Sequence, residues 1–460
     1  NTTFGTTITQ NATDIVALSA IALYPTALSA AIDTNSADIL ALSGGSSSVP
    51  SERIHVIQDV TYTGAVQNGT ASRPYNATAV GDLTTFIEGA ADGSKILIGP
   101  GIYEVAPSNS GGITLSKNVS IEGAGRDLTV IKCPDAHDVL GQVHIMFKTT
   151  ADADISVEIK DLTIDCNFHN VTTPIVAGAS INAIRTQISN FKCDNVRVTR
   201  CGEFERTAES FYMWSYGDSI ASFAGYSNIL FDNEYTGIRI PECLGSSVIT
   251  LGNGNGLPLP TSGYVKGCYI QRSDRGVGIG LARTEDIEIS GNTVLATPNS
   301  GPTPARLTQN TPFLHDTFVS TNVRVHDNIF DASDLSPHLV LTGAPDKAGV
   351  ITAPCWNYLI TNNTLTRKHT SSVQINPVVR ALSGSSICRG NFVTSHPESL
   401  SNRRMYWYTS GLSGTHVCVG NYAHSDAVEY ITSTASAAAA VTVNSDNFFI
   451  DTGVAIPNTP

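Results

Sequence analysis

The sequence predicts an all-β protein built as a coiled solenoid, and two observations lead to this. In the second half of the chain one polar residue returns between short apolar β-type runs, at Asn233, Asn292, Asn328, Asn363, Asn391, Asn421 and Asn447, with Cys268 in the one missing place. The successive spacings of 35, 24, 36, 35, 28, 30 and 26 residues fall within the roughly 20- to 50-residue period of solenoids. The composition agrees, because 39 Gly, 21 Pro and only 15% charged residues favour strands with many turns.

The repeated asparagine is interpreted as part of the scaffold. Its side chain tolerates the left-handed backbone conformation and bonds the backbone of a turn. Stacked asparagine side chains can also bond one another along a ladder. One asparagine per coil therefore predicts a repeated tight turn, and the chemistry is expected where the repeat is interrupted.

Charge and cysteine content exclude several classes. A net charge of −13 and a pI near 5.2, without clustered Lys and Arg, argue against a nucleic-acid partner. The sequence contains no run of 18 or more apolar residues, so no membrane insertion is expected. The nine cysteines are scattered through strand-like runs without a CxxC pair, which predicts buried thiols and no metal site. No cofactor motif is found, and we expect none.

The first 50 residues differ from the rest and predict a helical stem and linker. Apolar residues follow a heptad up to a break at Pro25, and with Ile32 and Ile39 at a positions, Asn35 falls at a d position. A buried Asn in a helical seam fixes register and oligomeric state. Two amphipathic helices packed on the body are the alternative. Residues 43–50, rich in Gly and Ser, are interpreted as the linker.

Residues 51–110 predict an N-terminal module in which a helix over residues 82–91 caps the solenoid. The helix is followed by Asp-Gly-x-x-Ile-x-Ile-x-x-Gly-x-Tyr, ending at Tyr103, and then by Val-Ser-Ile-x-Gly-x-Gly, ending at Gly125. This order resembles the cap and first coils of the pectin-lyase-like right-handed parallel β-helix. A helix there would cover strand edges that are otherwise unpaired. The resemblance implies a single-stranded β-helix over residues 111–450, followed by a tail over residues 451–460.

Ten or more coils are predicted from strand-like segments after the cap. These are residues 157–166, 195–200, 228–235, 265–272, 286–295, 322–331, 356–366, 386–394, 416–424 and 441–450. Two glycine-rich runs, residues 252–256 and 276–280, are interpreted as tight bends, since no helix follows to make a phosphate site. Two further insertions are predicted. The aromatic and basic residues 402–409 would contact an acidic sugar or form a subunit interface. The proline-rich residues 297–318 would form a surface loop.

The insertion over residues 201–217 is the strongest candidate for glycan contact, because carboxylates bond hydroxyls and sugar rings stack on aromatic side chains. Its aromatic residues could instead pin the loop to the body. If the coils stack in register, acidic residues of the next two coils approach this insertion. Two carboxyl groups about 5 to 9.5 Å apart are what glycoside hydrolysis needs. Elimination would instead need a base such as Lys, Arg, His or Tyr. The predicted catalytic residues are Glu203, Glu205, Asp232, Glu234 and Asp274, and the predicted substrate-binding residues are Arg206, Tyr212, Trp214, Tyr216, Arg239 and Arg275.

A stem, a cap and a long β-helix together resemble bacteriophage tailspikes and related receptor-binding proteins. This resemblance implies a homotrimer of the virion tail that binds and cleaves a bacterial surface polysaccharide, with tail or baseplate proteins as partners of the N-terminus. Unlike that family, the chain shows no C-terminal trimerisation domain after Ile450. The alternatives are a secreted bacterial enzyme of the same fold, such as a polysaccharide lyase, epimerase or fructotransferase, and a glycan-binding adhesin without catalysis.

Overall fold

The computed structural model describes residues 53–62, 67–138, 143–150, 153–167, 170, 180–186, 188–200, 202–203, 213–215, 223–227, 230–232, 247–252, 261–273, 277–282, 284–297, 314–316, 320–332, 340–342, 355–367, 379–381, 384–395, 404–408, 416–423, 429–433, 441–445, 447–449 and 455. The predicted stem, residues 1–50, lies outside the described residues, and the 451–460 tail is described only at Ala455.

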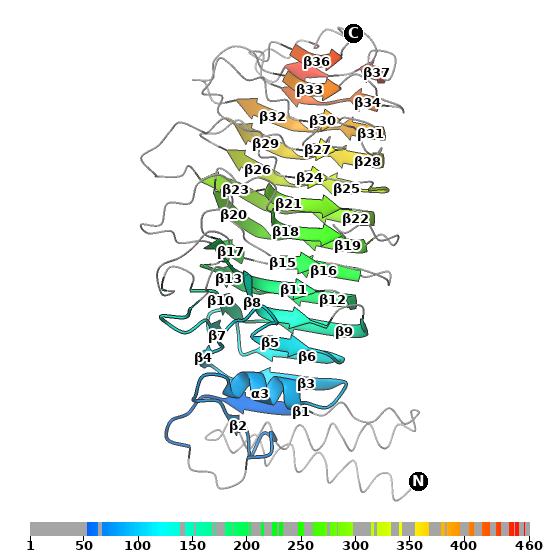
Figure 1. Ribbon diagram of the computed structural model, residues 1–460. Helices are drawn as coiled ribbons and strands as arrows, with labels where there is room; N and C mark the ends of the chain where they lie inside the picture. Colours follow the sequence, from blue (N-terminus) through cyan, green and yellow to red (C-terminus); the bar gives the residue numbers. More distant parts are fainter. Residues whose placement is uncertain are drawn as a thin grey trace, which may run out of the picture.

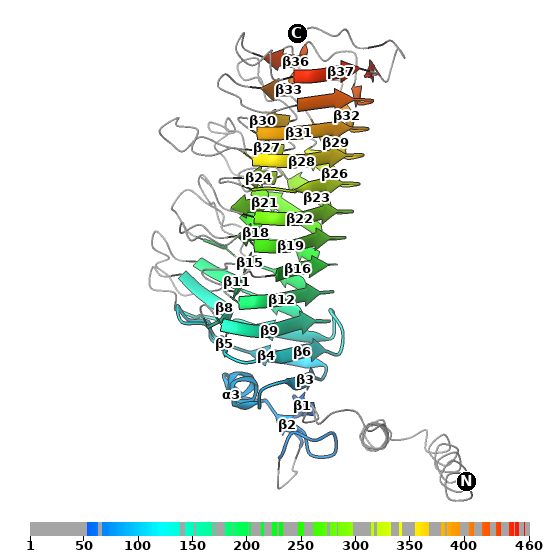
Figure 2. The same cartoon turned by 90° about the vertical axis from the view of Figure 1, so that its right-hand side faces the viewer.

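The chain winds into a stack of coils whose strands form three long parallel sheets (Figures 1 and 2). From β3 onward the chain visits sheet 1, sheet 2 and sheet 3 in turn, and each strand pairs with its equivalent one coil earlier and one coil later. This is the arrangement of a parallel β-helix, as the repeat predicted.

Sheet 1 has 14 strands in the spatial order β2 (Tyr75–Asn76), β1 (Arg53–Ile57), β3 (Ser94–Ile98), β6 (Val119–Gly123), β9 (Ala153–Lys160), β12 (Ile188–Asp194), β16 (Phe223–Ser227), β19 (Thr261–Lys266), β22 (Thr284–Ser290), β25 (Arg324–His326), β28 (Cys355–Thr361), β31 (Gly384–Arg389), β34 (His416–Val419) and β37 (Val441–Ser445). Sheet 2 has 12 strands, β4 (Gly101–Glu104), β7 (Thr129–Lys132), β10 (Thr163–Asp165), β13 (Arg197–Thr199), β17 (Leu230–Asp232), β20 (Tyr269–Ser273), β23 (Thr293–Thr297), β26 (Ile329–Ala332), β29 (Thr364–Arg367), β32 (Phe392–Ser395), β35 (Tyr422–Ala423) and β38 (Phe448–Phe449). Sheet 3 consists of β5 (Ile113–Leu115), β8 (Val143–Thr149), β11 (Ser180–Thr186), β15 (Met213–Ser215), β18 (Ser247–Gly252), β21 (Val277–Ala282), β24 (Leu314–Asp316), β27 (Val340–Thr342), β30 (Val379–Ala381), β33 (Arg404–Tyr408) and β36 (Glu429–Ser433), with β14 (Gly202–Glu203) antiparallel to β11.

Several segments predicted as single strands turn a corner between sheet 1 and sheet 2. The segment predicted over residues 157–166 divides into the end of β9 and all of β10, and Asp161 between them has a φ of 56°. Asn195 has the same conformation one coil later, with a φ of 51°. Both residue types tolerate a positive φ, so the polar residue between two apolar runs marks a corner.

The interior is a stack of identical register positions. One inward column of sheet 1 runs from Ile54 through Ile96, Ile121 and Ile159 to Cys193 in neighbouring strands, and all five side chains are buried. The six cysteines whose side chains are described, Cys133, Cys166, Cys193, Cys268, Cys388 and Cys418, are buried free thiols, as predicted. Burial raises the pKa of the Cys133 thiol to about 12, which keeps it protonated.

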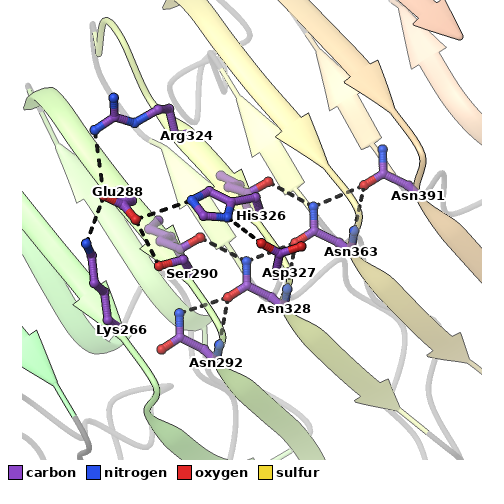
Figure 3. A network of polar contacts seen from close by, with 12 residues as sticks. Lys266, Glu288, Ser290, Asn292, Arg324, His326, Asp327, Asn328, Asn363 and Asn391 are labelled. Atoms are coloured by element: carbon purple, nitrogen blue, oxygen red, sulfur yellow. Dashed lines mark hydrogen bonds and ion pairs between the residues drawn. The ribbon is translucent and has the colours of Figure 1, made fainter.

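The predicted asparagine ladder is present at the corner between sheets 1 and 2 (Figure 3). The Oδ1 of Asn328 accepts hydrogen bonds from the backbone N–H and the Nδ2 of Asn292, at 3.0 and 2.8 Å. The Nδ2 of Asn328 donates to Ile289 O and to Asn363 Oδ1, both at 2.9 Å. The same pattern continues through Asn363, Asn391, Asn421 and Asn447, with all members at most 2% exposed. Buried amides thus satisfy one another from coil to coil.

Within the described residues the ladder begins at Cys268. The backbone N–H of Cys268 donates to Asn292 Oδ1 at 2.9 Å. Asn233, the remaining predicted member, lies outside the described residues.

Helix α3 (Asp82–Gly89) caps the stack where it was predicted (Figure 1). It lies against β5, the first strand of sheet 3, and buries Leu83 and Ile87. The side chain of Glu88 accepts the backbone N–H of Thr114 at 2.7 Å. The hydroxyl of Thr84 donates to the carbonyl of Gly112 at 3.0 Å. These helix side chains take the place of a neighbouring strand at the open edge of the sheet.

Two segments of sheet 3 were wrongly interpreted, because in the sequence glycines resemble a bend and clustered aromatic residues resemble an insertion. The predicted tight bend over residues 276–280 is largely strand, as Val277–Ala282 form β21. The predicted insertion over residues 402–409 contains β33, Arg404–Tyr408, which pairs with β30 and β36. Residues 253–256 of the other glycine-rich run lie outside the described residues. At the far end Ala455 forms an antiparallel bridge with Phe448.

Candidate functional site

The candidate site lies at the corner between sheets 2 and 3, hereafter corner 2–3, on the coils of β7, β10, β13, β17 and β20. Lys132, Asp165, Thr199 and Asp232 pair in sequence across the carboxyl ends of β7, β10, β13 and β17. Neighbouring strands lie about 4.8 Å apart, so each of these backbone positions is one coil from the next. Polar chemistry is therefore concentrated along one edge of sheet 2.

A buried carboxylate organises the lower part of corner 2–3. The Oδ1 of Asp165, a residue 3% exposed, accepts from Nε of Arg200 at 2.7 Å and from the backbone N–H of Asn167 at 3.0 Å, and its Oδ2 forms an ion pair with Nη2 of Arg200. The Nδ2 of Asn167 donates to Asp135 Oδ1 at 2.7 Å, and Lys132 Nζ donates to the same oxygen at 2.8 Å. The hydrogen bond from Lys132 is the main cause that lowers the pKa of Asp135. Three coils are thus tied together by charge-assisted bonds.

A histidine pair lies beside this network. Nε2 of His137 is 2.9 Å from Nδ1 of His144, which is also 3.1 Å from the carbonyl oxygen of Pro107. A carbonyl only accepts, so a ring nitrogen that bonds the Pro107 oxygen carries a proton. Burial lowers the pKa of both rings, which favours neutral imidazoles. The loop of His137 is joined to the network because Ala136 N donates to Asn170 O at 2.8 Å.

The structure describes three of the predicted site residues, and for these it gives the backbone position. Glu203 lies in β14 and pairs with Ser180 of β11. On the other side of β11, Ile181 pairs with His144, and it also pairs with Gly202. The backbones at His144 and Gly202 are therefore two strand spacings apart, about 10 Å. Sequence reasoning missed the histidines, although a His seven residues before another, in a loop and the strand after it, was visible in the sequence.

Asp232 ends β17, and Trp214 lies in β15 of sheet 3, where it pairs with Arg185 and Thr250. Trp214 was expected in an insertion, whereas its backbone belongs to a regular strand. The remaining predicted residues, Glu205, Glu234, Asp274, Arg206, Tyr212, Tyr216, Arg239 and Arg275, lie outside the described residues. Tyr216 follows β15 of sheet 3, and the others fall in the connections after β13, β17 and β20, which are neighbours in sheet 2.

A second polar cluster lies on the outer face of sheet 1 (Figure 3). Glu288 Oε2 is 2.9 Å from Lys266 Nζ and 3.7 Å from Arg324 Nη2, and its Oε1 is 3.3 Å from His326 Nε2. Nδ1 of His326 is 2.7 Å from Oδ2 of Asp327. The hydrogen bond from Lys266 lowers the pKa of Glu288. Because both carboxylate oxygens are occupied, Glu288 links β19, β22 and β25 and is not available as a base.

Within the described part of the chain, no group of three or more His, Cys, Asp or Glu side chains is arranged to hold a metal ion. In that same part, no helix is long and apolar enough to cross a membrane.

No family model matches the sequence, and a search of curated proteins finds no match. Solved structures are similar in fold. PfbA, a surface adhesin of Streptococcus pneumoniae, has a TM-score of 0.51 at 14% identity, covering 76% of this chain and 89% of that one. The A-module of a mannuronan C-5 epimerase from Azotobacter vinelandii has a TM-score of 0.41 at 13% identity, covering 76% and 92%. A DFA-IIIase from Arthrobacter chlorophenolicus A6 has a TM-score of 0.41 at 13% identity, covering 80% and 88%. At this level of identity the likeness shows the fold alone, and the chain is an all-β parallel β-helix.

Proposed function

We propose that this protein binds a polysaccharide along its β-helix and cleaves or modifies it at corner 2–3. The observation that carries the proposal is the register of sheet 2, in which Thr199 pairs with Asp232 and the connections bearing the other predicted carboxylates leave neighbouring strands. The names of the similar proteins, an epimerase, a DFA-IIIase and an adhesin, fit carbohydrate as the ligand. Corner 2–3 supplies carboxylates, cations and imidazoles within a few coils.

For hydrolysis, one carboxylic acid protonates the glycosidic oxygen while the second carboxylate assists attack at the anomeric carbon. We assign one of these roles to Asp232 and the other to one of Glu203, Glu205, Glu234 and Asp274. Backbone positions of successive coils are about 4.8 Å apart, so carboxylates carried one or two coils apart are compatible with the required separation of about 5 to 9.5 Å. Arg206, Arg239 and Arg275 would bind the sugar, together with the aromatic residues Tyr212, Trp214 and Tyr216.

The histidine pair favours a second reaction class at the same corner, β-elimination or epimerisation of a uronic acid. Such a reaction begins when a base removes the proton α to the sugar carboxylate. His137 and His144 have lowered pKa values, so a neutral imidazole is present near pH 7. A nearby cation would have to neutralise the substrate carboxylate, and arginines of the site supply that charge.

The experiment separates these reactions by their products. Wild-type protein is incubated with mannuronan, inulin and a bacterial surface polysaccharide, and absorbance near 235 nm and new reducing ends are followed together. New reducing ends without an increase in absorbance indicate hydrolysis, and reducing ends together with absorbance indicate elimination. If neither signal appears but the polymer is still bound, the protein is an adhesin. Asp232→Asn should abolish hydrolysis, and His137→Gln should abolish elimination. A chain that neither binds nor alters any of these polymers contradicts the proposal.

The finer reading as a phage tailspike rests on the sequence order of stem, cap and β-helix. It includes a homotrimer, location in the virion tail, and tail or baseplate proteins as partners, whereas the secreted bacterial enzyme needs none of these. The mass of the full chain in solution, measured by light scattering, distinguishes them. A mass of three chains supports the tailspike reading, and a monomer contradicts it.

A further inference from the structure

Exposed apolar side chains gather in one register column of sheet 2. Among the described residues ten large hydrophobic side chains are exposed, and six of them, Ile102, Tyr269, Ile329, Phe392, Tyr422 and Phe448, occupy this column. The column is continuous, since successive strand pairings connect Ile102 to Phe448 without a gap. Scattered exposed hydrophobics are ordinary, but their alignment in one column is not explained by chance exposure.

The last three members form a ladder of aromatic rings, hereafter the aromatic stripe: Phe392, Tyr422 and Phe448. Their exposed fractions are 37, 42 and 36%. Ring centroids are 6.4 Å apart for Phe392 and Tyr422 and 6.3 Å apart for Tyr422 and Phe448. The Tyr422 and Phe448 rings are stacked at an interplanar angle of 27°, and the Phe392 and Tyr422 rings are tilted at 39°. With more than a third of each side chain exposed, the three rings offer a continuous apolar surface to a ligand.

The stripe is too narrow for a stable protein interface. A large aromatic side chain has about 200 Å² of surface, and at roughly 40% exposure the three rings offer about 240 Å² together. A specific protein interface buries about 800 Å² on each partner. The stripe is one side chain wide and three coils long, and its first and last strands are about 10 Å apart along the backbone. This shape fits a thin linear polymer better than a second protein surface.

The chemistry of the ligand follows from the charge and the repeat. A net charge of −13 disfavours a nucleic acid, whose phosphates need basic side chains. The rings repeat once per coil, with centroids 6.3 to 6.4 Å apart, which is of the order of one sugar unit along an extended glycan. The apolar face of a pyranose ring stacks on an aromatic ring, and sugar hydroxyls remain in water.

We infer that the aromatic stripe is a glycan-holding subsite that binds a linear polysaccharide parallel to the β-helix axis, separate from corner 2–3. The inference rests on the proposed function in taking carbohydrate as the ligand. It adds a binding surface at the C-terminal end, which would keep the polymer attached between events at corner 2–3. Stripe and candidate site lie on the same sheet, but the stripe is at the amino ends of its strands and corner 2–3 is at their carboxyl ends.

The test is affinity electrophoresis of the full chain in gels containing mannuronan, inulin or hydroxyethyl cellulose. The relevant gel contains the polymer that retards wild type. In that gel each single variant, Phe392→Ala, Tyr422→Ala or Phe448→Ala, should show affinity about tenfold weaker than wild type, and the triple variant should not be retarded. Tyr422→Phe keeps the ring and should bind as wild type, whereas Phe392→Leu keeps an apolar side chain without a ring and should not. The matched control is Ile387→Ala, which removes a side chain 45% exposed on sheet 1 in the same coil as Phe392 and should leave retardation unchanged. Urea midpoints confirm that each variant is folded.

Four results separate the inference from the proposed function. If wild type is retarded and the triple variant is retarded equally, the inference is wrong and the proposed function stands. If no polymer retards wild type, both are wrong. If the triple variant has a lower mass by light scattering, the stripe joins copies of the chain and the inference is wrong. If the triple variant loses retardation while still acting on short oligosaccharides, the stripe holds the polymer as inferred.

Discussion

Removing one side-chain amide from the middle of the asparagine ladder should destabilise the β-helix more than the loss of so few atoms suggests. Asn391 is 1% exposed. Its Nδ2 donates to Ile360 O at 2.9 Å and to Asn421 Oδ1 at 3.0 Å. Its Oδ1 accepts from the backbone N–H and the Nδ2 of Asn363, at 3.1 and 3.0 Å. Asn391→Ala therefore breaks four buried hydrogen bonds and leaves their partners, in the coils on both sides, without these bonds.

The expected loss follows from these four bonds. A hydrogen bond contributes about 1 kcal/mol net, and a buried donor or acceptor left unsatisfied costs about 1 to 3 kcal/mol. The variant should thus lose about 4 kcal/mol of unfolding free energy. Asn447, the last member of the ladder, accepts twice from Asn421 and donates to Cys418 O at 3.3 Å. Asn447→Ala should cost less, about 2 to 3 kcal/mol.

Urea denaturation followed by circular dichroism measures both variants against wild type. Asn391→Asp extends the comparison, because its carboxylate would face two acceptors, the carbonyl of Ile360 and the Oδ1 of Asn421, and should be worse than alanine. If Asn391→Ala shifts the midpoint no more than Asn447→Ala, the ladder does not transmit stability between coils and the reasoning is refuted.

Three further predictions concern the ends of the ladder, the outer charges and the histidines. Cys268→Asn should change the unfolding free energy by less than about 1 kcal/mol, because the new donor for Asn292 Oδ1 is offset by a buried amide oxygen, and a midpoint shift as large as that of Asn391→Ala would contradict this. Glu288→Gln should lower stability near pH 7, because the ion pair with Lys266 is lost. The lowered pKa of Glu288 stabilises the fold above its unfolded pKa and ceases to do so as pH falls through the folded value, so the difference from wild type should close in acid. Equal differences at pH 7 and pH 3.5 would be inconsistent with it. Because the pKa of His144 is lowered in the folded protein, the fold loses stability as pH falls below the unfolded pKa of about 6.5. His144→Gln should therefore reduce the decrease in melting temperature between pH 7 and pH 5. An unchanged decrease would argue against a buried neutral pair.

The repeating part of the fold could be predicted because it depends on residues that are adjacent in the sequence. A residue that accepts a positive φ, followed by Asn and an apolar run, specifies the corner between sheets 1 and 2 without knowledge of distant contacts. The capping helix was predictable for a similar reason, since it precedes the first regular coil. Sheet 3 was harder, because strands such as Val277–Ala282 follow connections of variable length and contain glycines that resemble a bend.

Contacts between distant residues could not be predicted, because connections between strands differ in length and spacing along the chain does not determine register. The histidine pair was missed because His137 and His144 belong to neither the repeat nor an aromatic insertion. Their significance follows from a 2.9 Å contact that only the folded coil produces.

The most direct test of catalysis at corner 2–3 is the rate at which Asp232→Asn depolymerises the polysaccharide that wild type cleaves. Asp232 is the one predicted carboxylate whose position at the end of a sheet 2 strand is set by register, opposite Thr199. Loss of an acid or base group costs about 100- to 10,000-fold in rate. Asp232→Asn should therefore lose at least about 100-fold in rate, with retardation in affinity gels unchanged. Full activity in Asp232→Asn, at unchanged stability, would contradict it.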